Sequence, residues 1–167
     1  MKDTKTKAIT MAAAIAAIYV VLTLIANAMG LANYAIQVRF SEALTVLPFF
    51  TPVAIPGLFV GCLLSNILTG CAPLDIIFGS VATLLGALGT RFFAKKFPDK
   101  VFLAPIPPIV SNVIIVPFIL AYVYKFEGSL VYFMLTVGAG EIISCGILGL
   151  ILLKTIQKRT DLFDSKE

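Results

Sequence analysis

The chain has 167 residues, of which 59% are hydrophobic and 13% are charged, and its formal net charge is +4. Ordinary soluble domains are about 45–50% apolar and about 25% charged, so this composition excludes a water-soluble globular protein. The length leaves room for one compact membrane domain and for no separate soluble catalytic domain.

Several chemistry-bearing residue types and motifs are missing from the sequence. There is no His, the commonest metal ligand. The three cysteines (Cys62, Cys71 and Cys145) have no CxxC spacing and lie in apolar surroundings, which favours small buried side chains over redox or metal roles. No GxxxxGK[ST] motif occurs, so the chain does not bind ATP through a P-loop. We therefore expect no metal, no cofactor and no enzymatic activity.

Three long stretches carry no charge: residues 8–38, 43–74 and 101–124. Each exceeds the roughly 20 residues that a spanning helix needs. The first stretch is longer than the roughly 7–15-residue apolar core of a signal peptide, so we expect a retained helix. Pro48, Pro52 and Pro56 predict a break near residues 50–52. Five helices are then expected after the first, at about residues 39–49, 53–69, 75–93, 102–124 and 130–153.

The basic residues give an independent test of six spans, because Lys and Arg near span ends collect on the cytoplasmic side. With six spans and both termini inside, only Arg39 and Lys125 of the 13 basic residues lie outside. The inner residues are Lys2, Lys5, Lys7, Arg91, Lys95, Lys96, Lys100, Lys154, Lys158, Arg159 and Lys166. The sequence thus predicts an all-α membrane protein with six transmembrane helices over residues 8–156, between cytoplasmic tails at 1–7 and 157–167. The net positive charge comes mainly from these cytoplasmic Lys and Arg residues, so it gives no support for nucleic-acid binding.

Polar side chains inside the predicted spans are candidates for a binding site, because they are costly in a membrane. Glu141 lies about eleven residues into the last helix, roughly 16 Å deep at 1.5 Å per residue. Its neighbours Gly138 and Gly140 leave room for a planar ligand or another helix. Asn112 is expected at a similar depth, and Asn66 lies in the outer half of its helix. A buried acid held for packing, and interhelical hydrogen bonds of the amides, are the alternatives.

Three more charged residues are expected at the outer mouth of the same cavity. Arg39 and Glu42 are three residues apart and share a helix face, so a local ion pair is the alternative to a ligand contact. Asp75 opens a helix after a turn-rich connection, and a helix N-cap is its alternative role.

A stripe of small residues marks the inner half of the first helix. Ala8, Ala12 and Ala16 recur every four residues, with Ala13 and Ala17 alongside. Such a stripe permits close approach of another membrane helix. Its cytoplasmic position favours an external partner, and packing inside the domain is the alternative.

The motifs of this sequence resemble those of the QueT family, whose members are substrate-binding S components of energy-coupling factor (ECF) transporters. The resemblance rests on residues 37–50 (QVRFSEALTVLPFF), 55–62 (IPGLFVGC), 75–80 (DIIFGS) and 137–141 (VGAGE), within a match over about residues 8–155. It implies a six-helix S component of the prokaryotic cytoplasmic membrane that captures a 7-deazaguanine such as preQ1 or preQ0 from outside. It also implies partners, a transmembrane coupling subunit and two ATPases, with Ala8, Ala12 and Ala16 contacting the coupling subunit.

The predicted site is chemically compatible with that substrate. A 7-deazaguanine presents an N–H and an exocyclic amine side by side, which one carboxylate accepts together, and preQ1 adds a cationic aminomethyl group. Glu141 suits the first task, and Glu42 or Asp75 suits the second. Tyr34, Phe78 and Tyr132 are candidate stacking surfaces, although aromatic residues are common at membrane interfaces.

Two other functions remain open from the sequence. The chain is an S component for another vitamin or small heterocycle if the lining of the pocket differs from that expectation. It is a membrane assembly subunit without a small-molecule ligand if the polar groups are all satisfied by their neighbours.

Overall fold

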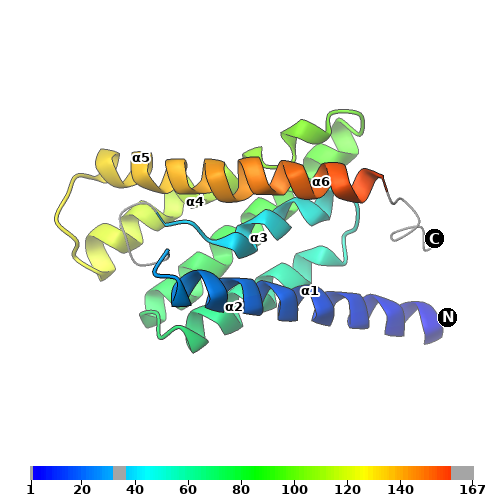
Figure 1. The fold of residues 1–167 in the computed structure, drawn as a ribbon, viewed down its shortest axis with the longest axis horizontal. Coiled ribbons are helices and arrows are strands. Elements are labelled where there is room, and N and C mark those ends of the chain that lie inside the picture. The colour runs from blue at the N-terminus through cyan, green and yellow to red at the C-terminus, as the bar shows by residue number, and fades with distance from the viewer. Residues whose placement is uncertain (1, 32–36, 159–167) are drawn as a thin grey trace.

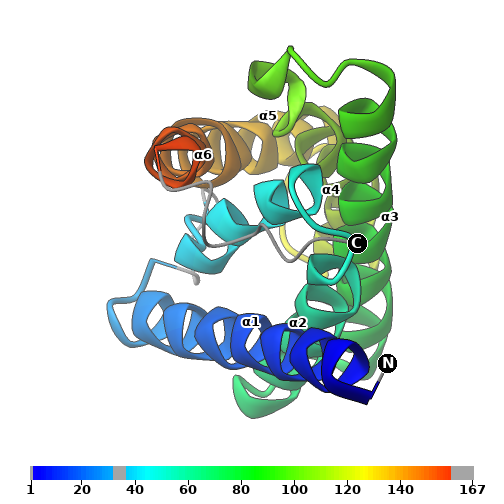
Figure 2. The same cartoon turned by 90° about the vertical axis from the view of Figure 1, so that its right-hand side faces the viewer.

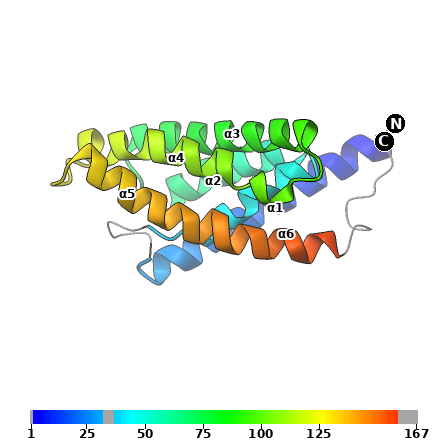
Figure 3. The same cartoon turned by 90° about the horizontal axis from the view of Figure 1, so that it is seen from above.

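A computed structural model describes residues 2–31 and 37–158, and every regular element within these two ranges is helical. The elements in chain order are α1 (Lys2–Ala28), η1 (Phe40–Phe49), α2 (Ala54–Leu68), α3 (Pro73–Lys96), η2 (Val101–Leu103), α4 (Ile106–Phe118), η3 (Ile119–Val123), α5 (Leu130–Glu141), η4 (Ile142–Leu148) and α6 (Gly149–Gln157). η1 and η2 are 3-10 helices, whereas η3 and η4 are π-helical. Since η3 continues α4 and η4 joins α5 to α6, the last two helical segments are continuous rods (Figures 1 and 3).

Four helical segments are long and apolar enough to cross a membrane: Thr4–Ala28, Pro73–Lys96, Val101–Val123 and Leu130–Gln157. The segments Phe40–Phe49 and Ala54–Leu68 are apolar but shorter. With 10 residues at about 2.0 Å per residue, η1 is about 20 Å long, less than the roughly 30 Å of a hydrocarbon core. The structure therefore contains four helices of spanning length and two shorter ones, where the sequence predicted six spans.

The division of residues 39–70 agrees with the proline pattern. η1 ends at Phe49 and α2 begins at Ala54, so the predicted break near residues 50–52 is confirmed. Pro56 lies in the first turn of α2, where a missing backbone N–H costs little.

The short helix η1 occupies the interior of the molecule. Eight of its ten residues are buried, and it contacts α1, α3, η4 and α6. Figure 2 shows it between α1 on one side and the α5–α6 rod on the other. A helix inside a bundle can carry polar side chains, because neighbouring helices and a ligand can satisfy them. The start of α1 and the end of α6 lie at the same end of the molecule (Figure 1).

α1 packs closely against α2 through small residues on both helices. A Cβ added at Gly57 would lie 2.7 Å from the Ala12 carbonyl oxygen, and one at Gly61 would lie 3.0 Å from the Ala16 carbonyl oxygen. Ala16 is buried, and Ala12 and Ala8 are half-buried. This packing is the internal contact that the sequence analysis gave as the alternative for Ala12 and Ala16, because small residues on facing helices let the backbones approach. Contact of the stripe with a coupling subunit stays a prediction.

Candidate functional site

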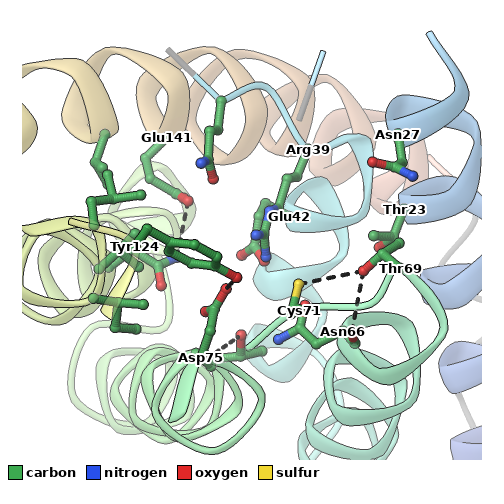
Figure 4. A pocket seen from close by; sticks show the side chains of 18 of the residues that line it. Thr23, Asn27, Arg39, Glu42, Asn66, Thr69, Cys71, Asp75, Tyr124 and Glu141 are labelled. Carbon is green, nitrogen blue, oxygen red and sulfur yellow. Dashed lines mark hydrogen bonds between the residues drawn. The ribbon is translucent and has the colours of Figure 1, made fainter. Parts of the chain in front are cut away.

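A cavity of about 280 Å³ lies among the helices, and we call it the central cavity. The structure brings around it all six polar residues that the sequence analysis singled out for binding: Arg39, Glu42, Asn66, Asp75, Asn112 and Glu141. Figure 4 labels all of them except Asn112. They come from η1 and the segment before it, α2, α3, α4 and α5. The helices that enclose the cavity are therefore distant in sequence, and their polar positions converge in space.

Two deeply buried carboxyl groups each have one oxygen held by the wall and one oxygen without a partner. Tyr19 of α1 donates a hydrogen bond to Glu42 Oε1, and Asn112 Nδ2 donates to Glu141 Oε1 at 3.0 Å. Glu42 is 2% exposed and Glu141 is 9% exposed. Among the described residues, the buried atoms Glu42 Oε2 and Glu141 Oε2 accept no hydrogen bond. An unsatisfied buried acceptor costs about 1–3 kcal/mol, so these oxygens are suited to receive donors from a ligand.

Asn66 adds a third acceptor of the same kind. Its side chain is 1% exposed, and its Nδ2 lies 3.7 Å from the Cys62 sulfur, while Oδ1 has no partner among the described residues. Thr83 also donates to the Cys62 sulfur, at 3.3 Å. The amide is thus oriented by its own helix and leaves its oxygen available.

Asp75 accepts a hydrogen bond across the cavity wall. The Tyr124 hydroxyl donates to Asp75 Oδ2 at 2.8 Å and accepts from the backbone N–H of Ala72 at 3.1 Å (Figure 4). Asp75 is the third residue of α3, and the cap position belongs to Ala72, so the carboxylate does not act as the N-cap. This bond ties the start of α3 to the segment that follows η3.

Arg39 enters the cavity from an extended segment that rests on α5 and η4. Its backbone N–H donates to Ser144 Oγ at 3.1 Å. Gly140 lets this segment approach, since an added Cβ would lie 3.1 Å from the Gln37 carbonyl carbon and closer still to its oxygen. Within residues 2–31 and 37–158, the Arg39 guanidinium forms no ion pair, so the local pair with Glu42 that the sequence left open is not formed.

The aromatic residues at the cavity differ from those that the sequence analysis suggested. Tyr34 lies outside the described residues. Phe78 and Tyr132 do not line the cavity and are 49% and 46% exposed. Among the described lining residues, the aromatic side chains are Tyr124 and Phe126, whose rings stack with centroids 5.7 Å apart and an interplanar angle of 22°. An exposed ring on a membrane helix costs little, because lipid is as apolar as the protein interior.

Several lining residues were not singled out from the sequence. The polar ones are Thr23, Asn27, Gln37, Thr69, Cys71 and Thr83. The rule that identified the other polar residues, a polar side chain in an apolar span, applies equally to Thr23, Asn27 and Thr83. Tyr124 and Phe126 carried a weaker signal, which was their position at the end of a span on the side expected for Asp75.

The cavity offers unpartnered hydrogen-bond acceptors from three of its described lining residues, Glu42, Asn66 and Glu141. Three acceptor atoms are buried without partners, and the Arg39 guanidinium is the one basic side chain among the described lining residues. Nowhere in the described ranges do three or more His, Cys, Asp or Glu residues form a group that could hold a metal ion. The arrangement therefore suits a small organic molecule that is rich in N–H donors.

The comparisons with known proteins identify the family of the chain. The family model described as "QueT transporter" matches residues 9–158. A curated relative, "Queuosine precursor transporter QueT" of Lactococcus lactis subsp. cremoris (strain MG1363), is 35% identical over 103 residues, which are 61% of this chain. The chain spans 60% of the length of that relative. No solved structure matches the chain. The chain therefore belongs to the QueT transporter family, and it is a multi-pass membrane protein of a transporter family, not an enzyme.

Proposed function

We propose that this chain is the substrate-capturing S component of an ECF-type transporter in the prokaryotic cytoplasmic membrane. It binds a 7-deazaguanine queuosine precursor, preQ1 or preQ0, from the extracellular side for ATP-driven uptake. The observation that carries the proposal is the central cavity, in which Glu42, Asn66 and Glu141 each present a buried acceptor without a partner. Membership of the QueT transporter family and the printed name of the Lactococcus lactis relative support the same substrate class.

The size and polarity of the cavity fit one bicyclic heterocycle. Its volume of about 280 Å³ lies near the lower end of the roughly 300–1,000 Å³ that is usual for small-molecule sites. A 7-deazaguanine carries ring N–H groups and an exocyclic amine, which are donors that match the unpartnered acceptors. A scaffold subunit without a ligand would gain nothing from leaving these acceptors unsatisfied.

Glu141 is the residue that binds the edge of the ring in this proposal. Asn112 holds Glu141 Oε1 at 3.0 Å, so the orientation of the carboxyl group is fixed before the ligand enters. A carboxylate that accepts two adjacent N–H groups forms a planar bidentate contact. Arg39, the basic residue among the described lining residues, donates to the carbonyl oxygen of the ring in this proposal.

The energy for uptake comes from partner subunits in this proposal, because the sequence contains no P-loop. The partners are a transmembrane coupling subunit and two ATPases. With Ala12 and Ala16 packed toward α2, the exposed alanines of the inner half of α1, Ala13 and Ala17, form the side that remains free for a coupling subunit.

The binding proposal is tested by calorimetry with preQ1 and preQ0 on the purified protein and on Glu141→Gln. Loss of a hydrogen bond to a charged group costs about 1.5–3 kcal/mol, so the affinity should fall roughly 10- to 100-fold. Glu127→Gln, the same change at an exposed loop residue, is the matched control and should bind like the wild type. An unchanged affinity of Glu141→Gln would remove Glu141 from the site. A wild-type protein that binds neither compound would overturn the function.

A further inference from the structure

One part of the cavity wall combines a carboxylate with two aromatic rings. Asp75, Tyr124 and Phe126 all line the cavity, and the two rings stack on each other 5.7 Å apart. This set of groups differs from the pair formed by Glu141 and Asn112, which offers a carboxyl group beside an amide. Asp75 lies in α3 and the two rings follow η3, whereas Asn112 lies in α4 and Glu141 in α5, and the two sets present different chemistry to a ligand.

One carboxyl oxygen of Asp75 accepts a hydrogen bond, and the other is available to a ligand. Its Oδ2 accepts from Tyr124 at 2.8 Å, whereas Oδ1 accepts no hydrogen bond from a described residue. Gly79 leaves the space beside Oδ1 open, since a Cβ there would lie 3.0 Å from that oxygen. Asp75 also lies in the first turn of α3, where the backbone N–H groups favour a negative charge.

The two rings supply the second element of a cation site. The hydroxyl of Tyr124 is committed to Asp75 and to the Ala72 N–H, and its ring stacks on Phe126. Partial burial, followed by the bond to Asp75, raises the pKa of the Tyr124 phenol, so Tyr124 remains the donor. An ammonium ion near aromatic faces is attracted by their quadrupoles, and a neighbouring carboxylate adds to this attraction.

The charged groups around the cavity also favour a cationic ligand. The described lining residues include three carboxyl groups but one basic side chain, Arg39. Charges removed from water require compensation by opposite charges and hydrogen bonds. A cationic ligand brings a positive charge beside the Asp75 carboxyl group, whereas a neutral ligand does not.

We infer that the central cavity selects a planar heterocycle that carries an ammonium group, and that Asp75, flanked by Tyr124 and Phe126, binds this group. The inference rests on the proposed function, because it divides the same cavity into a site for the ring and a site for the cation. It separates the two candidate precursors. preQ1 carries a cationic aminomethyl group and fits both sites, whereas the neutral nitrile of preQ0 offers nothing to Asp75.

The test is the ratio of the affinities for preQ1 and preQ0, measured by calorimetry on the wild type and on Asp75→Asn. The wild type should prefer preQ1, and Asp75→Asn should reduce this preference about 10- to 100-fold, as expected for loss of a charged hydrogen-bond partner. Glu141→Gln should weaken both compounds in parallel and leave the ratio in place. Asp99→Asn, the same change at an exposed loop position, is the matched control.

The outcomes distinguish the inference from the proposed function. A wild type that binds both compounds equally, or an Asp75→Asn protein that keeps the ratio, overturns the cation site while the transport of a precursor stands. A collapse of the ratio in Glu42→Gln instead assigns the cation to Glu42 and also overturns the inference. If neither compound binds the wild type, the proposed function fails as well. If Asp75→Asn does not fold, Phe126→Leu serves as the second variant, because the Phe126 ring is half-exposed. This change should lower the ratio of the preQ1 and preQ0 affinities several-fold, which corresponds to about 0.5–1 kcal/mol. An unchanged ratio overturns the inference.

Discussion

Replacing Gly140 with alanine should weaken ligand binding although residue 140 does not line the cavity. The added Cβ would lie 3.1 Å from the Gln37 carbonyl carbon and closer still to its oxygen, whereas ordinary contacts begin near 3.4 Å. These are backbone atoms, which cannot rotate away, so the extended segment must move off α5. Such overpacking costs about 1–3 kcal/mol of folding free energy. The same segment carries Arg39, and loss of its contact to the ligand would cost a further 1.5–3 kcal/mol, or roughly 10- to 100-fold in affinity.

The matched control for this prediction is Gly138→Ala in the same helix. The nearest atom to an added Cβ there is Val113 Cγ2 at 3.4 Å, an ordinary contact with a side chain. Alanine has a higher helix propensity than glycine, and this gain is the same for both substitutions. It therefore cancels when the free energies of unfolding of the two variants are compared. Affinity for preQ1 by calorimetry and the free energy of unfolding in detergent should fall for Gly140→Ala, whereas neither should fall for Gly138→Ala. Equal behaviour of the two variants would refute the reasoning that the contact with Gln37 positions Arg39.

Two further predictions concern packing and access. Gly61→Ala should lower the free energy of unfolding by about 1–3 kcal/mol, because its Cβ would lie 2.8 Å from Tyr19 Cβ. Gly146→Ala should not lower the free energy of unfolding, because the nearest atom to its Cβ would lie 3.8 Å away. Equal stability of the Gly61→Ala and Gly146→Ala variants would contradict the close α1–α2 contact. Cys71, half-buried at the cavity, should react with a small maleimide faster than the two fully buried cysteines, and preQ1 should slow this reaction, as followed by mass spectrometry. Labelling of Cys71 that preQ1 leaves unchanged would place the ligand elsewhere.

Much of the fold follows from hydropathy and proline placement. Apolar length located the helices, and Pro48 and Pro52 located the break after η1. The burial of η1 did not follow, because a short apolar helix has the same composition whether it faces lipid or protein. The stripe with Ala12 and Ala16 was ambiguous for a related reason. Small residues permit close helix contact within a domain and between subunits alike, and Gly57 supplied the partner inside the domain.

The position of the polar residues around the cavity was predictable, and that of the aromatic residues was not. Asn66, Asn112 and Glu141 have no partner in lipid, so a position within an apolar span already indicates that they face the interior. Phe78 and Tyr132 have no such constraint, since an aromatic ring is tolerated on either side of a membrane helix. The rotation of a helix about its axis is therefore fixed by its polar residues and left open by its aromatic ones.

The three acids of the cavity share one arrangement of hydrogen bonds, which bears on the stability of the ligand-free and ligand-bound protein. Each has a single wall donor, from Tyr19, Asn112 or Tyr124, which fixes the orientation of the carboxyl group and leaves the other oxygen for a ligand. The buried unpartnered oxygens of Glu42 and Glu141 cost free energy that a donor-rich ligand offsets, so the ligand-free protein should be the less stable state. A transporter gains from this arrangement, because the binding free energy that fills the cavity also stabilises the helices that enclose it. Capture of substrate and stability of the bundle should then be coupled through the same hydrogen bonds.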